Sequence, residues 1–107
     1  MDKNLQILIK KLSELRNASI KSTPDTIRET MKKYNMLFVG SEFNNIYSIE
    51  LHHSLKTIFN IDIAMSELNE LIPTACKMLN MNFEELIAIE DIGKTNPFIN
   101  YQIILWK

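Results

Sequence analysis

The chain has 107 residues and a formal net charge of −1, and hydrophobic residues make up 46% of it. This length and composition are typical of one globular domain with a core of its own. A single cysteine, Cys76, excludes an internal disulfide framework and favours a reducing compartment, so we expect a cytoplasmic protein. Charged residues interrupt the apolar pattern near the N-terminus, which argues against a signal peptide and against a membrane-spanning segment.

Charge is distributed unevenly along the chain. Residues 1–35 contain eight Lys or Arg and four Asp or Glu, a net charge of +4, whereas residues 36–107 contain four and nine, a net charge of −5. Such an asymmetry is typical of proteins with a basic arm that faces nucleic acid. The alternative is that the basic helices form ion pairs with the acidic remainder of the chain, and the sequence leaves both interpretations open.

Two amphipathic helices are expected in the basic third of the chain. Leucine and isoleucine recur at spacings of three and four over residues 3–17, which predicts a helix with one apolar face. Residues 18–23 are expected to be a connector. Thr23 is a good N-cap and is followed by proline, so a second helix is expected to begin there and to run to about Tyr34.

The middle of the chain is expected to hold one short strand and two further helices. The apolar run at 36–39 predicts a brief strand, and capping residues after it predict a helix over 46–59. A fourth helix is expected over 66–81, with Ser66 as its N-cap. Pro73 removes one intrahelical hydrogen bond, so we expect a kink there; the alternative is a new helix that begins at this proline.

Residues 86–107 are expected to form a β-hairpin. Ile87 and Ile89 share one face of the first strand, as the two-residue period of a half-buried sheet requires. The second strand has a matching apolar face, made of Ile99, Tyr101, Ile103 and Leu105. Between the strands, residues 93–97 begin with glycine and end with proline, which predicts the turn of the hairpin.

Side chains suited to catalysis or to metal binding are few. His52 and His53 are adjacent, so on a helix they point about 100° apart and do not face one metal ion. Cys76 falls on an apolar face, which favours a core thiol over a nucleophile. The two glycines, Gly40 and Gly93, are too few for a phosphate-binding loop. We therefore expect no enzyme activity, catalytic site, metal, cofactor or small-molecule substrate.

The order of these elements, a helix, a short strand, two helices and a terminal hairpin, resembles the winged helix-turn-helix superfamily over residues 24–107. The resemblance implies an α+β fold, mostly helical, with three to four helices and a C-terminal β-hairpin whose turn is the wing. In that superfamily the second helix of the helix-turn-helix, here 66–81, commonly enters the major groove of DNA. We expect a single domain, with an N-terminal helix and connector over 1–22 and the winged-helix-like core over 23–107.

We predict a small regulatory protein that binds DNA or is otherwise associated with nucleic acid. The basic helices and the wing are expected to hold phosphates, and asparagines of the fourth helix to read base edges. The candidate residues are Lys10, Lys11, Lys32, Lys33, Asn69, Lys77, Asn80, Lys94 and Asn96. The outer face of the fourth helix carries a net charge of −1, which opposes phosphate binding. The alternative is a winged helix that docks on a basic protein partner, or forms a homodimer through its first helix, without touching DNA.

Overall fold

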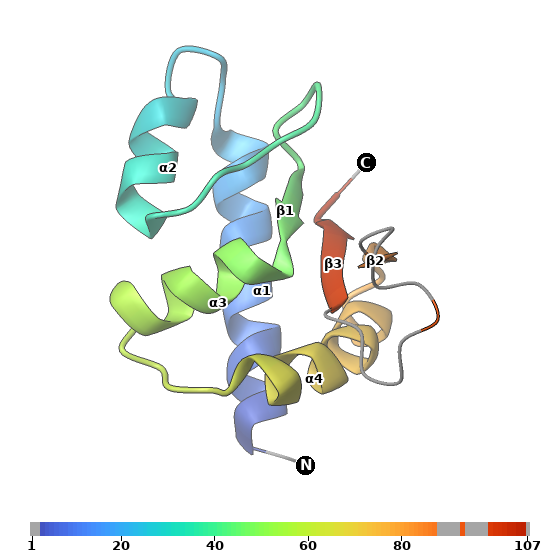
Figure 1. The fold of residues 1–107 in the computed structure, drawn as a ribbon. Coiled ribbons are helices and arrows are strands. Elements are labelled where there is room, and N and C mark those ends of the chain that lie inside the picture. Colours follow the sequence, from blue (N-terminus) through green and yellow to red (C-terminus); the bar gives the residue numbers. More distant parts are fainter. Residues whose placement is uncertain (1–2, 88–92, 94–98, 107) are drawn as a thin grey trace.

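A computed structural model describes residues 3–87, 93 and 99–106 (Figure 1). Within them lie four helices and three strands, so the fold is α+β and mostly helical, as predicted. In chain order the elements are α1 (Lys3–Lys21), α2 (Ile27–Tyr34), β1 (Asn45–Tyr47), α3 (Ser48–Thr57), α4 (Met65–Met78), β2 (Asn82–Ile87) and β3 (Ile99–Ile104). Among the described residues, no helix combines the length and the apolar character needed to cross a bilayer.

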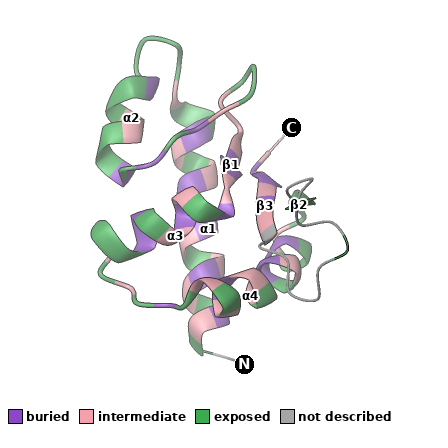
Figure 2. Cartoon of the chain, in the orientation of Figure 1, coloured by how far each residue is buried: buried purple, intermediate pink, exposed green. Residues whose placement is uncertain are grey.

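α1 lies in the hydrophobic core. Leu8, Leu12 and Leu15 have no exposed surface, because spacings of three and four place them on one face of the helix. Buried positions on α1 are purple in Figure 2. The helix continues past the predicted end at residue 17 to Lys21, and Ser19 in its last turns is also fully buried. α1 therefore contributes a row of buried leucines to the hydrophobic core of the domain.

Two side-chain hydrogen bonds set the direction of α1 relative to α4. Asn4 Nδ2 donates to Glu67 Oε2 over 2.6 Å near the start of both helices. Arg16 donates from a guanidinium nitrogen to the carbonyl oxygen of Leu79, over 2.9 Å, just past the end of α4. The start of α4 therefore lies near the start of α1, and the end of α4 lies near the later turns of α1.

α2 begins at Ile27, later than predicted. The carbonyl oxygen of Thr23 accepts hydrogen bonds from the backbone N–H groups of Thr26 and Ile27, at 3.0 and 2.9 Å, and these bonds close a separate turn ahead of the helix. The helix ends at Tyr34, as predicted, because Asn35 adopts a left-handed conformation with φ of 50°.

The predicted strand at 36–39 is wrong, because the strand that joins the sheet is β1. Burial alternates along 36–39 as it does in a strand, yet this segment is linked to β1 by one bridge, between Val39 and Asn45. β1 carries the fully buried Ile46 into the sheet. As a result α3 begins at Ser48, two residues later than predicted.

α4 is one helix that continues through Pro73, so the alternative of a new helix beginning at this proline is wrong. It begins at Met65, and the predicted N-cap, Ser66, lies within its first turn. Four side chains on one face hold both halves of the helix on the core, and this burial offsets the hydrogen bond that proline removes. They are Leu68, Ile72, Ala75 and Cys76.

The sheet is antiparallel and its strand order is β1-β3-β2. The predicted hairpin is confirmed as β2 and β3, although β2 begins at Asn82, ahead of the predicted residue 86. Phe83 lies opposite Ile103, and the centroids of the Phe83 and Tyr101 rings are 5.9 Å apart. These contacts make the inner face of the sheet.

The predicted apolar face of β3 is buried where its side chains are described. Tyr101, Ile103 and Leu105 are at most 8% exposed. On β2 the prediction is less accurate, because Ile87 is 37% exposed near the end of the described part of the strand. Ile89 lies outside the described residues.

Candidate nucleic-acid interface

The outer face of α1 carries a row of exposed lysines. Lys3, Lys10 and Lys21 are separated by 7 and 11 residues, which places them on one side of a helix. The row spans about 27 Å at 1.5 Å per residue. Of these lysines only Lys10 was predicted to bind phosphate, although the same spacing in the sequence would have identified the other two.

α2, which lies beside the C-terminal end of α1 (Figure 1), carries three more exposed cations. They are Arg28, Lys32 and Lys33, of which the two lysines were predicted. The helices are joined where Ser22 Oγ and Thr30 Oγ1 lie 2.8 Å apart. We call the set of six the basic surface: Lys3, Lys10, Lys21, Arg28, Lys32 and Lys33.

The cations of the basic surface have no carboxylate partner within the described part of the chain. Among the described residues, one ion pair lies within 4.0 Å, and it joins Lys11 Nζ to Glu14 Oε1 at 3.7 Å inside α1. The interpretation in which the basic helices pair with the acidic remainder of the chain therefore does not describe these residues. Their positive charge faces solvent, where it is available to a polyanion.

Lys11, which was also predicted to hold phosphate, is occupied within the protein. Its side chain is half-buried, and Nζ lies 4.4 Å from the centroid of the Phe59 ring as well as near Glu14. A cation above an aromatic face is attracted by the ring quadrupole. The contact with Phe59 attaches α1 to the segment after α3. Because Lys11 is half-buried and paired with Glu14, we leave it out of the basic surface.

Tyr34, the last residue of α2, packs against the same Phe59 ring. Its ring centroid lies 6.0 Å from that of Phe59, and Lys33 Nζ lies 5.3 Å from the Tyr34 ring. Burial raises the pKa of Tyr34 to about 12, and the hydrogen bond to Glu14 and the negative charge of that carboxylate raise it as well. The tyrosine is therefore neutral at physiological pH and acts as a packing group.

The outer face of α4 differs from the prediction. Asn69 is half-buried, and Asn80 lies beyond the helix in a left-handed conformation with φ of 56°. Glu67 is half-buried and accepts the hydrogen bond from Asn4. The charged side chains that α4 does expose are Glu70 and Lys77, one of each sign. The helix that was expected to read DNA thus presents a nearly neutral surface.

The wing falls largely outside the described residues. Lys94 and Asn96, the two predicted contacts in it, are not among them. Gly93 is described, and it is an exposed turn residue with φ of +90°, a conformation that favours glycine.

The two histidines face different neighbours. His52 Nε2 donates to the carbonyl oxygen of Ile63 over 2.8 Å, whereas Asn35 Nδ2 donates to His53 Nε2 over 3.0 Å. Among the described residues no three His, Cys, Asp or Glu side chains are grouped to hold a metal ion.

Cys76 is fully buried, and burial raises the pKa of its thiol to about 11, so the unreactive thiol form dominates at neutral pH.

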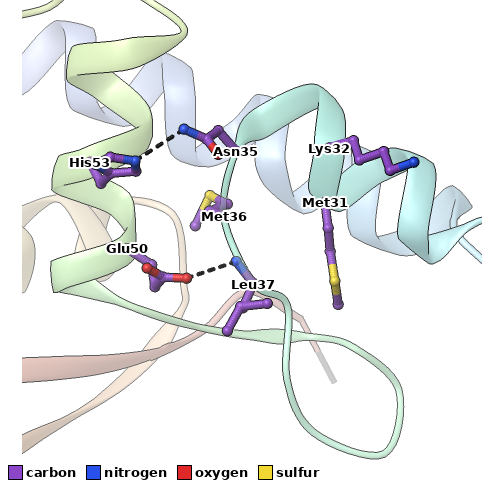
Figure 3. A pocket seen from close by; sticks show the side chains of 7 residues that line it. All are labelled: Met31, Lys32, Asn35, Met36, Leu37, Glu50 and His53. Atoms are coloured by element: carbon purple, nitrogen blue, oxygen red, sulfur yellow. Dashed lines mark hydrogen bonds between the residues drawn. The ribbon is translucent and has the colours of Figure 1, made fainter.

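An open hollow of about 360 Å³ lies between α2 and α3 (Figure 3). On its α3 side Glu50 Oε1 accepts a hydrogen bond of 3.1 Å from the backbone N–H of Leu37. Lys32 forms part of its rim, and its side chain extends away from the hollow (Figure 3). Three other polar residues line the hollow, Asn35, Glu50 and His53, and each is engaged in a hydrogen bond with a neighbour, so it presents no converging set of ligand groups.

Comparison with protein-family models, with curated proteins and with solved structures gives no match for this chain. The inference of function therefore depends on the exposed side chains and on the charge they carry.

Proposed function

We propose that this chain is a small nucleic-acid-associated protein that holds a nucleic-acid backbone along the basic surface. The observation that carries the proposal is the state of the six cations: all are exposed, and none has a carboxylate within 4.0 Å among the described residues. A row of lysines about 27 Å long matches an extended polyanion better than a small ligand.

The architecture supports a winged-helix relationship. The chain order of α2, β1, α3, α4 and the hairpin is the order that the resemblance to that superfamily implies, and β1 pairs with the hairpin through β3. In such a fold α3 and α4 form the helix-turn-helix. The proposal departs from the usual arrangement in one respect, since it assigns the main phosphate contacts to α1 and α2.

Contacts between a protein and phosphates release condensed counterions. Binding through such contacts depends little on base sequence and weakens as the salt concentration rises. The exposed charges of α4, Glu70 and Lys77, add little net attraction for phosphate. We therefore propose that binding depends mainly on the backbone and only weakly on sequence. The same balance of charge gives little support to the alternative in which α4 docks as an acidic helix on a basic protein.

The test is a fluorescence-anisotropy titration with duplex and single-stranded DNA at low and moderate salt. We expect binding at micromolar protein that weakens steeply with salt. If each of the six cations meets one phosphate, affinity falls by about 10³-fold between roughly 50 and 200 mM salt. Absence of salt-dependent binding at micromolar protein would overturn the proposal and favour protein docking.

Two variants of equal charge change locate the site. Lys10→Glu with Lys32→Glu reverses two cations of the basic surface, and we expect it to weaken binding to all sequences and to lower the salt slope by about two. The matched control is Lys56→Glu with Lys77→Glu, which reverses two exposed lysines on α3 and α4. Equal losses in both variants would contradict the assignment of the main phosphate contacts to the basic surface.

A further inference from the structure

β2 forms an edge of the sheet that the described residues leave open. β3 is its one strand partner among them, and five of its six residues are exposed. In an antiparallel pair, backbone N–H and C=O groups of alternate residues point away from the partner strand. β2 therefore presents outward-facing donors and acceptors over a length typical of a natural strand.

The other edge of the sheet is less suited to pairing with another chain. β1 has three residues and continues directly into α3 at Ser48. Ser48 Oγ accepts a hydrogen bond of 2.8 Å from the backbone N–H of Tyr101 and donates one of 2.9 Å to Asn100 Oδ1. The start of α3 thus occupies the position where β1 would otherwise extend along β3.

Side chains give the open edge a definite chemical character. Glu84 and Glu85 are exposed on opposite faces of β2 and have no cation within 4.0 Å among the described residues. They are followed by Leu86 and Ile87, each 37% exposed, again one on each face. The edge therefore offers two carboxylates and then two apolar side chains to a neighbouring strand.

We propose that β2 accepts an extended segment of a partner protein as a fourth strand of the sheet. Main-chain hydrogen bonds provide the pairing, and side chains of the incoming segment provide the selectivity. An antiparallel segment that matches the edge has two apolar residues followed by two basic ones, because the apolar pair then meets Ile87 and Leu86 and the basic pair meets Glu85 and Glu84.

A second copy of this chain is a poor occupant of the same edge. In a two-fold pairing of β2 with β2, centred on the carboxylates, Glu84 of one copy faces Glu85 of the other, and like charges in opposed positions oppose strand pairing. Charge also excludes a nucleic-acid backbone there. α2 and β2 lie on opposite sides of the molecule, so the edge is separate from the α2 part of the basic surface (Figure 1).

The experiment uses a labelled eight-residue peptide with two valines followed by two lysines, flanked by threonines, and a matched peptide with glutamates in place of the lysines. We expect the basic peptide to bind at least about tenfold more tightly than the acidic one. When the basic peptide binds, we expect the chemical shifts of the protein's backbone amides to change along β2. Failure of the basic peptide to bind at millimolar concentration, or equal binding of the two peptides, would overturn the proposal.

The two glutamates of β2 could select the partner segment, or they could only protect an edge strand against aggregation. Charge-swap variants distinguish these two roles. Glu84→Lys with Glu85→Lys should reverse the preference between the two peptides, and Glu84→Gln with Glu85→Gln, a milder change, should abolish it. If either variant retains the original preference, the carboxylates do not select the partner. Lys10→Glu with Lys32→Glu should leave peptide binding unchanged. The test of peptide binding is therefore independent of the test of nucleic-acid binding.

Discussion

Trp106 Nε1 donates a hydrogen bond of 2.8 Å to Ser19 Oγ, across 87 positions of sequence. Ser19 Oγ in turn donates to the carbonyl oxygen of Phe43 over 2.6 Å. The segment after β3 and the loop before β1 are therefore both attached to α1. The fully buried hydroxyl of Ser19 is thus the donor in one of these hydrogen bonds and the acceptor in the other.

We predict that Ser19→Ala destabilises the protein by about 1–3 kcal/mol, because it leaves the indole N–H and a carbonyl oxygen without their partner. Urea unfolding of the variant and the parent protein measures the difference. Ser66→Ala is the control, since Ser66 is exposed in the first turn of α4, and it should change the free energy of unfolding by less than about 0.5 kcal/mol. Equal effects of the two variants would contradict the role assigned to Ser19.

Two other buried serines should respond in opposite ways to the same substitution. Among the described residues Ser54 Oγ is buried with no hydrogen-bond partner, whereas Ser48 Oγ has two. Because an unsatisfied buried hydroxyl is costly and alanine favours helix, Ser54→Ala should leave the melting temperature unchanged or raise it. Ser48→Ala should lower it. Thermal unfolding followed by circular dichroism gives the comparison, and a clear loss of stability in Ser54→Ala would refute this assignment.

The burial of α1 predicts that the fold requires it. Leu12→Ala should reduce the free energy of unfolding by about 2–5 kcal/mol, because it leaves a cavity in a fully buried site. Ile20→Ala, in the same helix but 53% exposed, should have little effect. A chain that lacks residues 1–21 should lose cooperative unfolding, and a truncated chain that still unfolds cooperatively would show that the core forms without α1.

Stability should fall in strongly alkaline solution through Tyr34. Its folded-state pKa of about 12 lies above the ordinary value of 10.0, so the folded state holds this proton more tightly than the unfolded state does. The contribution is complete below about pH 10 and is lost as pH rises toward 12, with a size of order 2 kcal/mol. Parallel unfolding experiments should show the parent losing stability relative to Tyr34→Phe over this range, and a constant difference would argue against the shift.

The helical parts of the fold were predictable where one local pattern dominates. The leucine spacing identified α1, but its extension to Lys21 was missed because Ser19 is held by Phe43 and Trp106, which are distant in sequence. Alternating burial at 36–39 resembles a strand, yet the register of β3 selects 45–47 for pairing. Sequence pattern reports which side of a segment is apolar, and long-range pairing decides which segments enter the sheet.

The candidate site was predictable in part for the same reason. Lys10 and Lys32 are exposed, as expected of residues that hold phosphate. The pairing of Lys11 with Phe59 could not be foreseen, because it depends on where the segment after α3 packs. Helical periodicity predicted that Asn69 lies on the outer face of α4, but this residue is half-buried. Which side of a helix is covered depends on the elements that pack beside it.

The most direct test of the proposed binding mode is an NMR titration of the isotope-labelled protein with a short DNA duplex at low salt. We predict that amide chemical-shift changes are concentrated in α1 and α2, along the basic surface, and that they disappear as salt is raised. Changes confined to α4 and the hairpin would contradict this account, because they would place the nucleic acid on the helix-turn-helix face instead.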